Sequence, residues 1–185
     1  MSVDTREKLS LTTVVLHWIV GVGVIVAMIV GFVMAKNELY AIYPIHKSVG
    51  ALLFIFILWR VVWRIKQGPL THVGQYSQIE NILAKIVVLV MLLGTVLFPL
   101  SGMIMSYFGG SGLSFFGLEL VAANIGADGK REALNGGIAS FARSVHGWLL
   151  PIMAIAIILH IIGAYKHHFV DKDGTMKRIL GKRVA

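Results

Sequence analysis

Four long runs of hydrophobic residues, separated by shorter polar stretches, dominate this chain of 185 residues. An α-helix that crosses a hydrocarbon layer about 30 Å thick needs roughly 20 such residues at about 1.5 Å each. The second run is the weakest, because Lys47 and Arg60 leave only a short uncharged stretch between them. The pattern predicts membrane-spanning helices over about 10–35, 45–64, 81–107 and 144–168, within one integral membrane domain covering residues 1–185.

The composition favours the same class of protein. Hydrophobic residues make up 57% of the chain and charged residues 14%, whereas the surface of a soluble domain of this length would need far more charge. Since the chain contains no Cys, disulfides and the covalent attachment of c-type haem are excluded, and any haem must be held non-covalently. The formal net charge of +8 is not arranged as a basic stripe with interleaved aromatic residues, so we expect no nucleic-acid partner.

Lys and Arg are distributed unevenly beside the predicted helices. The N-terminal arm, the second connection and the C-terminal tail together carry twelve of them, and the opposite side carries five. Cytoplasmic segments of membrane proteins carry the excess of Lys and Arg. We therefore expect both termini in the cytoplasm, with a short first loop and a longer third loop, about 107–143, on the outer side.

Two histidines of the fourth predicted helix share one face. His146 and His160 are 14 residues apart in a stretch, 144–165, that has no charged residue. This spacing is four turns less roughly 40°, or about 21 Å along the helix axis. Polar groups inside a bilayer are costly and usually functional. The interval therefore indicates two cofactors stacked at different depths.

With the expected orientation, four helical histidines form two pairs by depth. His17 and His160 are expected near the cytoplasmic side, and His46 and His146 near the outer side. A six-coordinate haem needs two axial nitrogens from different helices at one height, and the chain supplies this arrangement twice. The second nitrogen of each ring can bond a backbone carbonyl. For a single histidine a proton relay or a buried hydrogen bond is the alternative, but four in matched pairs favour haem ligation.

Small and basic residues near these histidines favour the same interpretation. Gly21, Gly50 and Gly163 each lie about one turn from a histidine, where a missing side chain would let a flat macrocycle approach the backbone. Close packing of membrane helices is the alternative reason for such glycines. Arg60, 14 residues beyond His46, is a candidate partner for a propionate of the inner haem. Its alternative is a side chain that extends to the lipid headgroups.

Further basic residues flank the predicted helices. His167 and His168 follow the fourth helix and could bond a quinone carbonyl or relay protons, because histidine titrates near neutral pH; headgroup binding is the alternative. His72, in the polar second connection, is expected to be solvated. Lys47 and Arg143 are candidates for outer-haem propionates or for attracting an anion, with a solvated loop charge as the alternative.

Short motifs surround these residues along nearly the whole chain. They are His17-Trp18, His46-Lys47-Ser48-x-Gly50, Arg60-x-x-Trp63-Arg64, Pro99-Leu100-Ser101-Gly102, His146-Gly147-Trp148, His160, His167-His168-Phe169 and Lys172-Asp173-Gly174. Together they resemble the bacterial cytochrome b561 family, four-helix cytochromes of the inner membrane with two b haems. The resemblance implies that the axial iron ligands are His17, His46, His146 and His160. Some members of the family have histidines at the start of the third helix, and residues 78–85 contain none here, so no quinone-site residue is carried over from that helix.

The resemblance also implies a function. We expect a four-transmembrane-helix bundle in the bacterial inner (plasma) membrane, with two haem b groups stacked across the bilayer. It would carry electrons between the quinone pool and a small redox molecule or redox protein at the periplasmic face. Superoxide is one candidate outer substrate and ubiquinone the candidate acceptor, which would make the protein an oxidoreductase. The basic outer residues are compatible with an anionic substrate: Lys47, Lys130, Arg131 and Arg143.

Two other hypotheses belong to different classes of protein. The first is a haem-bearing membrane anchor subunit of a larger dehydrogenase or hydrogenase. Its docking surface could be the longer third loop, which has the apolar residues Phe115, Phe116, Leu118 and Leu120. The second is a proton or solute transporter, which would bind no haem.

Overall fold

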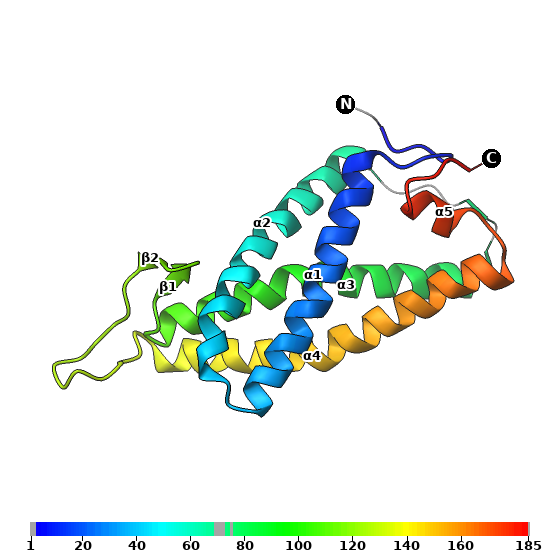
Figure 1. The fold of residues 1–185 in the computed structure, drawn as a ribbon. Helices are drawn as coiled ribbons and strands as arrows, with labels where there is room; N and C mark the ends of the chain where they lie inside the picture. Colours follow the sequence, from blue (N-terminus) through cyan, green and yellow to red (C-terminus); the bar gives the residue numbers. More distant parts are fainter. Residues whose placement is uncertain (1–2, 69–72, 75, 185) are drawn as a thin grey trace. The chain divides into compact units, whose positions relative to one another are not determined.

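Helices make up most of the computed structural model, which describes residues 3–68, 73–74 and 76–184 (Figure 1). The long helices are α1 (Leu11–Lys36), α2 (Tyr43–Gln67), α3 (Gln78–Phe108) and α4 (Gly136–Tyr165). The shorter elements are the 3-10 helix η1 (Tyr40–Ile42), β1 (Leu113–Phe115), β2 (Leu118–Val121), the π-helix η2 (Lys166–Val170) and α5 (Thr175–Ile179). Within the described residues, four helices are long and apolar enough to cross a membrane. The prediction of an all-α membrane protein with four spanning helices is confirmed.

Two helices begin earlier than the hydrophobic pattern predicts. α4 begins at Gly136 rather than near residue 144, and Asn135 caps it by accepting a hydrogen bond from the Ile138 N–H at 3.0 Å. α3 begins at Gln78 rather than near residue 81. There the Ser77 hydroxyl accepts from the Glu80 N–H, and the Glu80 carboxylate accepts from the Ser77 N–H at 2.9 Å. This reciprocal capping box satisfies N–H groups that would otherwise lack partners at the helix start.

The chain forms two compact units. The terminal unit consists of Met1–Gly21, Phe56–Leu93 and Ile152–Ala185, and the hairpin unit consists of Val22–Ile55 and Gly94–Pro151. Each of the four long helices contributes one part to each unit.

In the terminal unit, the two ends of the chain are joined by hydrogen bonds. The Val184 N–H donates to the Glu7 carbonyl oxygen at 2.9 Å, and the Arg183 guanidinium pairs with the Glu7 carboxylate. The Trp18 indole N–H donates to the Ile179 carbonyl oxygen at 3.0 Å, which attaches α5 to the start of α1. These contacts order the C-terminal tail beside the N-terminal arm.

In the hairpin unit, β1 and β2 form an antiparallel pair in the loop between α3 and α4. Phe116 and Gly117 make the turn with φ angles of 48° and 88°, the left-handed conformation that two-residue hairpin turns favour. The Phe116 N–H donates to the buried Ser48 hydroxyl at 2.9 Å, which fixes the hairpin tip to α2. The side chains of Phe116, Leu118 and Leu120 remain exposed.

Candidate haem sites

The terminal unit brings together one of the two histidine pairs. His17 on α1 and His160 on α4 have ring centroids 6.2 Å apart, with ring planes inclined by 51°. An imidazole nitrogen binds a first-row metal at about 2.0–2.1 Å, so a ring centroid lies roughly 3 Å from the metal and two opposed rings lie about 6 Å apart. The observed separation therefore fits two axial ligands of one haem iron.

The glycines beside these histidines adjoin open space. A Cβ atom added at Gly21 or at Gly163 would meet no atom of the described residues within 4 Å. The same holds for Gly50 in the hairpin unit. The helical Gly23 does not adjoin open space, because a Cβ there would collide with the Leu53 side chain. At the three glycines predicted beside a macrocycle, the described residues therefore leave open space next to the backbone.

Arg60 lies beside the terminal-unit pair. It is half-buried on α2 and close enough to His17 and to His160 for electrostatic interaction with both. A guanidinium in this position has the charge and the donors to bind a carboxylate. Arg60 thus lies near His17 and His160, the two histidines expected to hold the inner haem.

In the hairpin unit, α3 orients the ring of His146. Its Nδ1 lies 2.9 Å from the Phe98 carbonyl oxygen and 3.1 Å from the Ser101 hydroxyl, and the ring stacks on Phe98 with centroids 4.5 Å apart. Because a carbonyl oxygen can only accept, Nδ1 carries the proton and Nε2 keeps its lone pair. This is the tautomer of a histidine that binds a metal through Nε2 and is oriented by a second hydrogen bond.

Glycines give both histidine rings of the hairpin unit room to lie against a neighbouring helix. A Cβ added at Gly102 would lie 3.2 Å from Cε1 of His146, and one at Gly31 would lie 3.0 Å from Cε1 of His46. His46 is close enough to His146 for electrostatic interaction. Sequence reasoning quoted Ser101 and Gly102 in a motif without giving either a role, and it missed Gly31. Contacts between helices, which no spacing within one helix reveals, define these roles.

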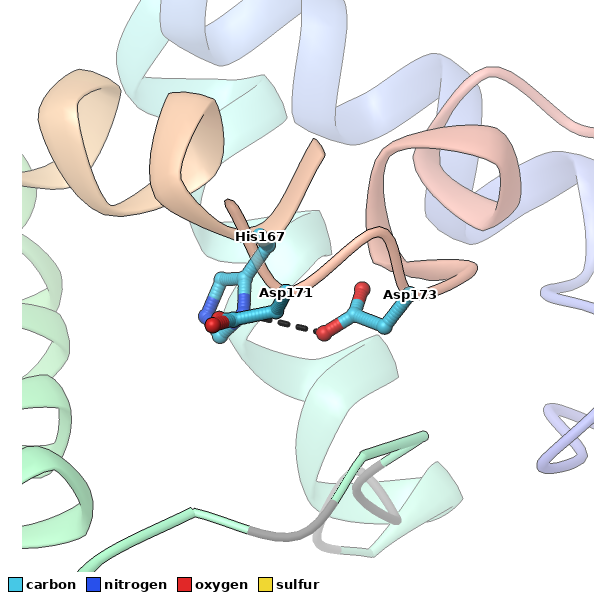
Figure 2. A group of neighbouring side chains, drawn as sticks. All are labelled: His167, Asp171 and Asp173. Atoms are coloured by element: carbon cyan, nitrogen blue, oxygen red, sulfur yellow. Dashed lines mark hydrogen bonds and ion pairs between the residues drawn. The ribbon is translucent and has the colours of Figure 1, made fainter. Parts of the chain in front are cut away.

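A compact polar cluster follows α4 in the terminal unit. Figure 2 shows the side chains of His167, Asp171 and Asp173 close together. Nδ1 of His167 lies 3.0 Å from Oδ2 of Asp173 and 3.2 Å from Oδ2 of Asp171. The possible ligand atoms of the three side chains lie within 4.8 Å of one another. The His167 ring contacts both carboxylates, so the two aspartates hold it in position.

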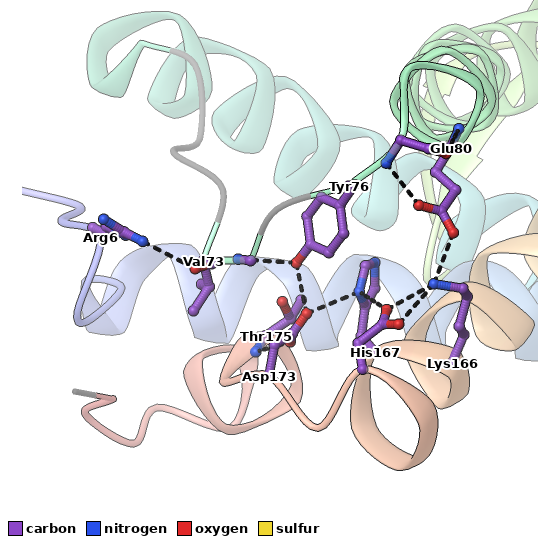
Figure 3. Close-up of polar contacts among 11 residues, drawn as sticks. Arg6, Val73, Tyr76, Glu80, Lys166, His167, Asp173 and Thr175 are labelled. Carbon is purple, nitrogen blue, oxygen red and sulfur yellow. Dashed lines mark hydrogen bonds and ion pairs between the residues drawn. The ribbon is translucent and has the colours of Figure 1, made fainter.

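Further contacts tie this cluster to the start of α3 (Figure 3). The Tyr76 hydroxyl donates to Asp173 at 2.6 Å. The Lys166 ammonium bridges Glu80, at 2.9 Å, and Asp171, at 2.8 Å. The cluster thereby joins the segment before α3, the start of α3 and the end of α4 in one network.

The two adjacent histidines predicted for a quinone or proton site have different surroundings. His167 is half-buried in the network, whereas His168 is exposed and packs edge-on against Phe169 with centroids 4.6 Å apart. They belong to the π-helical segment that continues α4. His72 lies outside the described residues.

The basic residues predicted for the outer side lie in the hairpin unit and are not equivalent. Lys47 and Arg131 are close enough to interact electrostatically. Arg131 also donates to the Ser111 hydroxyl at 3.1 Å. Lys130 pairs with Asp128 at 3.7 Å, and Arg143 is exposed within α4.

Four membrane-length helices with histidines close to one another between helices are an arrangement typical of membrane cytochromes, and comparison with known proteins shows the family. The model of the prokaryotic cytochrome b561 family matches residues 8–182, so the chain belongs to that family. It is 30% identical over 184 residues to Cytochrome b561 homolog 2 of Escherichia coli (strain K12), covering 97% of this chain and 94% of that protein. It is 26% identical over 182 residues to the Probable superoxide oxidase CybB of Yersinia pestis, covering 96% and 98%. The protein is a membrane electron-transfer protein of a family that binds b-type haem.

Proposed function

We propose that the chain holds two b haems, one in each unit, and carries electrons between them across the bacterial inner membrane. His17 and His160 would ligate one iron, and His46 and His146 the other. The 6.2 Å separation of the His17 and His160 rings is the observation that carries this proposal. The Nδ1–H of His146 on the Phe98 carbonyl oxygen supports it, because it leaves Nε2 free to bind iron.

The haem supplies a one-electron iron couple when bound. The side chains of this protein hold and tune it. Two histidines would hold each iron, which would favour electron transfer over the binding of an external ligand. The apolar helices exclude water, and Arg60 would offset the charge of a propionate in the terminal unit.

We further propose that the terminal unit faces the cytoplasm and exchanges electrons with the quinone pool, while the hairpin unit faces the periplasm. The distribution of Lys and Arg supports this orientation. In its doubly protonated form His167 would donate its Nε2–H to a quinone carbonyl or deliver that proton, because Asp173 accepts the hydrogen bond from Nδ1–H. His168 would serve as a second proton carrier at the surface.

The specific reaction we propose is oxidation of superoxide coupled to reduction of ubiquinone. Two superoxide anions each lose one electron and become O₂, and one ubiquinone accepts both electrons and two protons to become ubiquinol. The printed name of the Yersinia pestis relative supports the choice of superoxide. Lys47 and Arg131 support it physically, since neighbouring cations raise the local concentration of a small anion.

The decisive experiment counts haems in single variants. Pyridine haemochrome quantification and reduced-minus-oxidised spectra would be measured on wild type and on His17→Ala, His46→Ala, His146→Ala and His160→Ala. We expect two haems per chain in wild type. His17→Ala and His160→Ala should lose the same haem, and the other two variants the other. His168→Ala, an exposed control, should keep both. If His17→Ala and His46→Ala lost the same spectral component, the pairing would be wrong.

A second candidate function is a haem-bearing anchor subunit of a larger dehydrogenase or hydrogenase. The exposed apolar side chains of Phe116, Leu118 and Leu120 at the hairpin favour it, because such a patch can dock another protein. Purification in mild detergent distinguishes the two functions. A stoichiometric partner protein would support the anchor, and superoxide-driven ubiquinone reduction by the isolated chain would support the oxidoreductase.

A further inference from the structure

Arg64, near the end of α2, is held by a buried carboxylate of the N-terminal arm. Its Nη1 donates to Oδ2 of Asp4 at 3.2 Å, and the Asp4 side chain is only 4% exposed. Asp4 is itself fixed, since it accepts hydrogen bonds from the Ser10 N–H at 2.8 Å and from the Thr13 hydroxyl at 2.8 Å and 2.9 Å. The Trp63 indole N–H donates to the same Thr13 hydroxyl at 2.8 Å. One edge of the Arg64 guanidinium is therefore firmly positioned.

The opposite edge of that guanidinium has no partner in the part of the chain that the structure describes. Nε and Nη2 of Arg64 are both buried, and neither makes a hydrogen bond to any described residue. A buried donor left without a partner is destabilising, and more so when it is charged. Nε and Nη2 are adjacent donors in one plane, which is the geometry that binds a carboxylate or a phosphate through two parallel hydrogen bonds.

The surroundings of Arg64 carry an excess of positive charge. Arg60, one turn earlier on α2, and Arg178 on α5 are both close enough to Arg64 for electrostatic interaction. Arg178 is only 5% exposed. Burial is the main cause that lowers the pKa of Arg178, although Asp4 and Tyr76 act in the opposite direction. Arg64 thus lies within electrostatic range of two further guanidinium groups and pairs with a single carboxylate, Asp4, so an added anion would be stabilised beside it.

We propose that Nε and Nη2 of Arg64 bind a propionate carboxylate of the haem held between His17 and His160. This inference rests on the proposed function, which assigns that haem. Arg60 lies within electrostatic range of both histidines, and Arg64 follows it by one turn, about 5–6 Å along the same face of α2. Arg60 and Arg64 therefore form a path of positive charge from the histidine pair to the unoccupied guanidinium edge, and the propionates are the anionic groups of haem.

The test replaces Arg64 by Gln and measures the midpoint potential of each haem by spectroelectrochemistry. Removing a cation beside the haem disfavours the ferrous form. We expect the ferric-to-ferrous ratio of the terminal-unit haem at a fixed potential to rise about tenfold, which for a one-electron couple is a downward shift of about 59 mV. The resonance Raman band of propionate bending should shift in the same variant. The midpoint potential of Arg64→Lys should fall between those of wild type and Arg64→Gln. Lys66→Gln removes an exposed cation from the same end of α2 and should change neither measurement.

Asp4→Asn separates this role from a purely structural one. If Arg64 only anchors the N-terminal arm to Asp4, Arg64→Gln and Asp4→Asn should move the potential in the same direction or leave it unchanged, and either result overturns the proposal. If Arg64 binds the propionate, Asp4→Asn removes a negative charge and raises the potential, opposite in sign to Arg64→Gln.

A phospholipid headgroup has similar anionic chemistry, and one further arm distinguishes it. In detergent shown by phosphate assay to be free of lipid, the difference between wild type and Arg64→Gln should persist. If it vanished there and returned in phospholipid nanodiscs, the headgroup would be the ligand and the proposal would be wrong. Failure of the proposed haem ligation looks different, because it appears as wrong haem counts in the histidine variants, whereas failure of this proposal leaves both haems bound in the Arg64 and Asp4 variants.

Discussion

The terminal unit and the hairpin unit position their histidines by different means. In the terminal unit, His17 and His160 lie with ring centroids 6.2 Å apart, beside the guanidinium of Arg60. In the hairpin unit, a backbone carbonyl and a hydroxyl of α3 orient His146, and Gly102 gives its ring room. The first site has a charged side chain, Arg60, beside it, and the second is built from backbone and small residues. Substitutions should therefore act mainly through charge at the first site and mainly through hydrogen bonding and packing at the second.

The two arrangements also offer different ways to set a redox potential. A nearby cation stabilises the ferrous form of haem, and a hydrogen bond from the second ring nitrogen makes an imidazole a stronger donor to iron. The terminal unit has the first device in Arg60, and the hairpin unit has the second in the Nδ1–H of His146. Changing each device separately tests whether the two units differ in this way.

The largest effect is expected from filling the space beside a histidine. Gly163→Leu should remove the terminal-unit haem from most molecules, since its side chain would enter space that the macrocycle needs. The haem-free fold should survive, because a Cβ there meets no described atom within 4 Å. Pyridine haemochrome quantification should fall from two haems per chain to one, while the circular dichroism spectrum stays helical.

Matched variants in the hairpin unit show whether this effect is specific. Gly50→Leu should lose the other haem. Gly147 also adjoins open space, but it lies about 100° around the helix from His146, so Gly147→Leu should keep both haems. Retention of both haems by Gly163→Leu would contradict the assignment of the open space to a macrocycle.

A smaller effect is expected from disturbing the orientation of His146. Gly102→Val places a branched side chain where even a Cβ lies 3.2 Å from the His146 ring, so the ring must move from the Phe98 carbonyl oxygen. Loss of a hydrogen bond of about 1 kcal/mol plus the steric strain should weaken haem retention about tenfold. The rate of haem transfer to excess apomyoglobin measures this loss.

Ser101→Ala serves as the milder companion to Gly102→Val. It removes only the hydroxyl at 3.1 Å from Nδ1 and leaves the Phe98 carbonyl oxygen in place. It should accelerate transfer of the hairpin-unit haem by less than Gly102→Val and leave the terminal-unit haem unchanged. Equal transfer rates from both haems in both variants would show that the contact between α3 and His146 does not position a haem ligand.

The helices and the histidine intervals could be predicted from the sequence because both depend on local periodicity. The hydrophobic runs locate α1 to α4, and a spacing of 14 residues fixes the relation of His146 to His160 within one helix. The early start of α4 is also a local property, since Asn135 caps the helix. The hydrophobic run begins later than this cap, and a boundary predicted from that run is therefore too late.

The contacts between helices could not be predicted in the same way. Ser101 and His146 meet across 45 positions of the chain, and their contact depends on the register of α3 against α4, which no pattern within either helix specifies. Similarly, His167 and His168 are neighbours in sequence, but the hydrogen bond to Asp173 is made by His167. Which of the two rings faces Asp173 depends on how the chain continues after the π-helical turn. The open edge of Arg64 is likewise visible only once Asp4 is seen to occupy the other edge.

The smallest effect is expected in the polar network of the terminal unit. The Asp173 side chain is 9% exposed and accepts hydrogen bonds from Tyr76 at 2.6 Å and from the Thr175 N–H at 2.8 Å. Burial raises the pKa of Asp173, but the hydrogen bonds from Tyr76 and Thr175 and the charge of His167 outweigh it, so the pKa lies below its usual value. A carboxyl group with a lowered pKa stabilises the fold above its unfolded pKa of about 3.9, and this stability is lost as the pH falls through the folded pKa.

Asp173→Asn should therefore destabilise the protein at pH 7 and matter progressively less below about pH 4. A loss of about 1 kcal/mol corresponds to roughly 2–4 °C in Tm for a chain of this size. Thermal unfolding in detergent from pH 7 down to about pH 3 measures the difference. Asp128→Asn removes an exposed ion pair with Lys130, and the Asn oxygen can still accept the hydrogen bond from the Lys130 N–H, so it should leave Tm unchanged. A Tm difference for Asp173→Asn that persisted undiminished in acid would mean that the side chain acts through its shape rather than its charge. The network would then depend on shape and hydrogen bonding, as the contact between His146 and α3 does, and the contrast between a unit that uses charge and a unit that uses backbone and small residues would not hold.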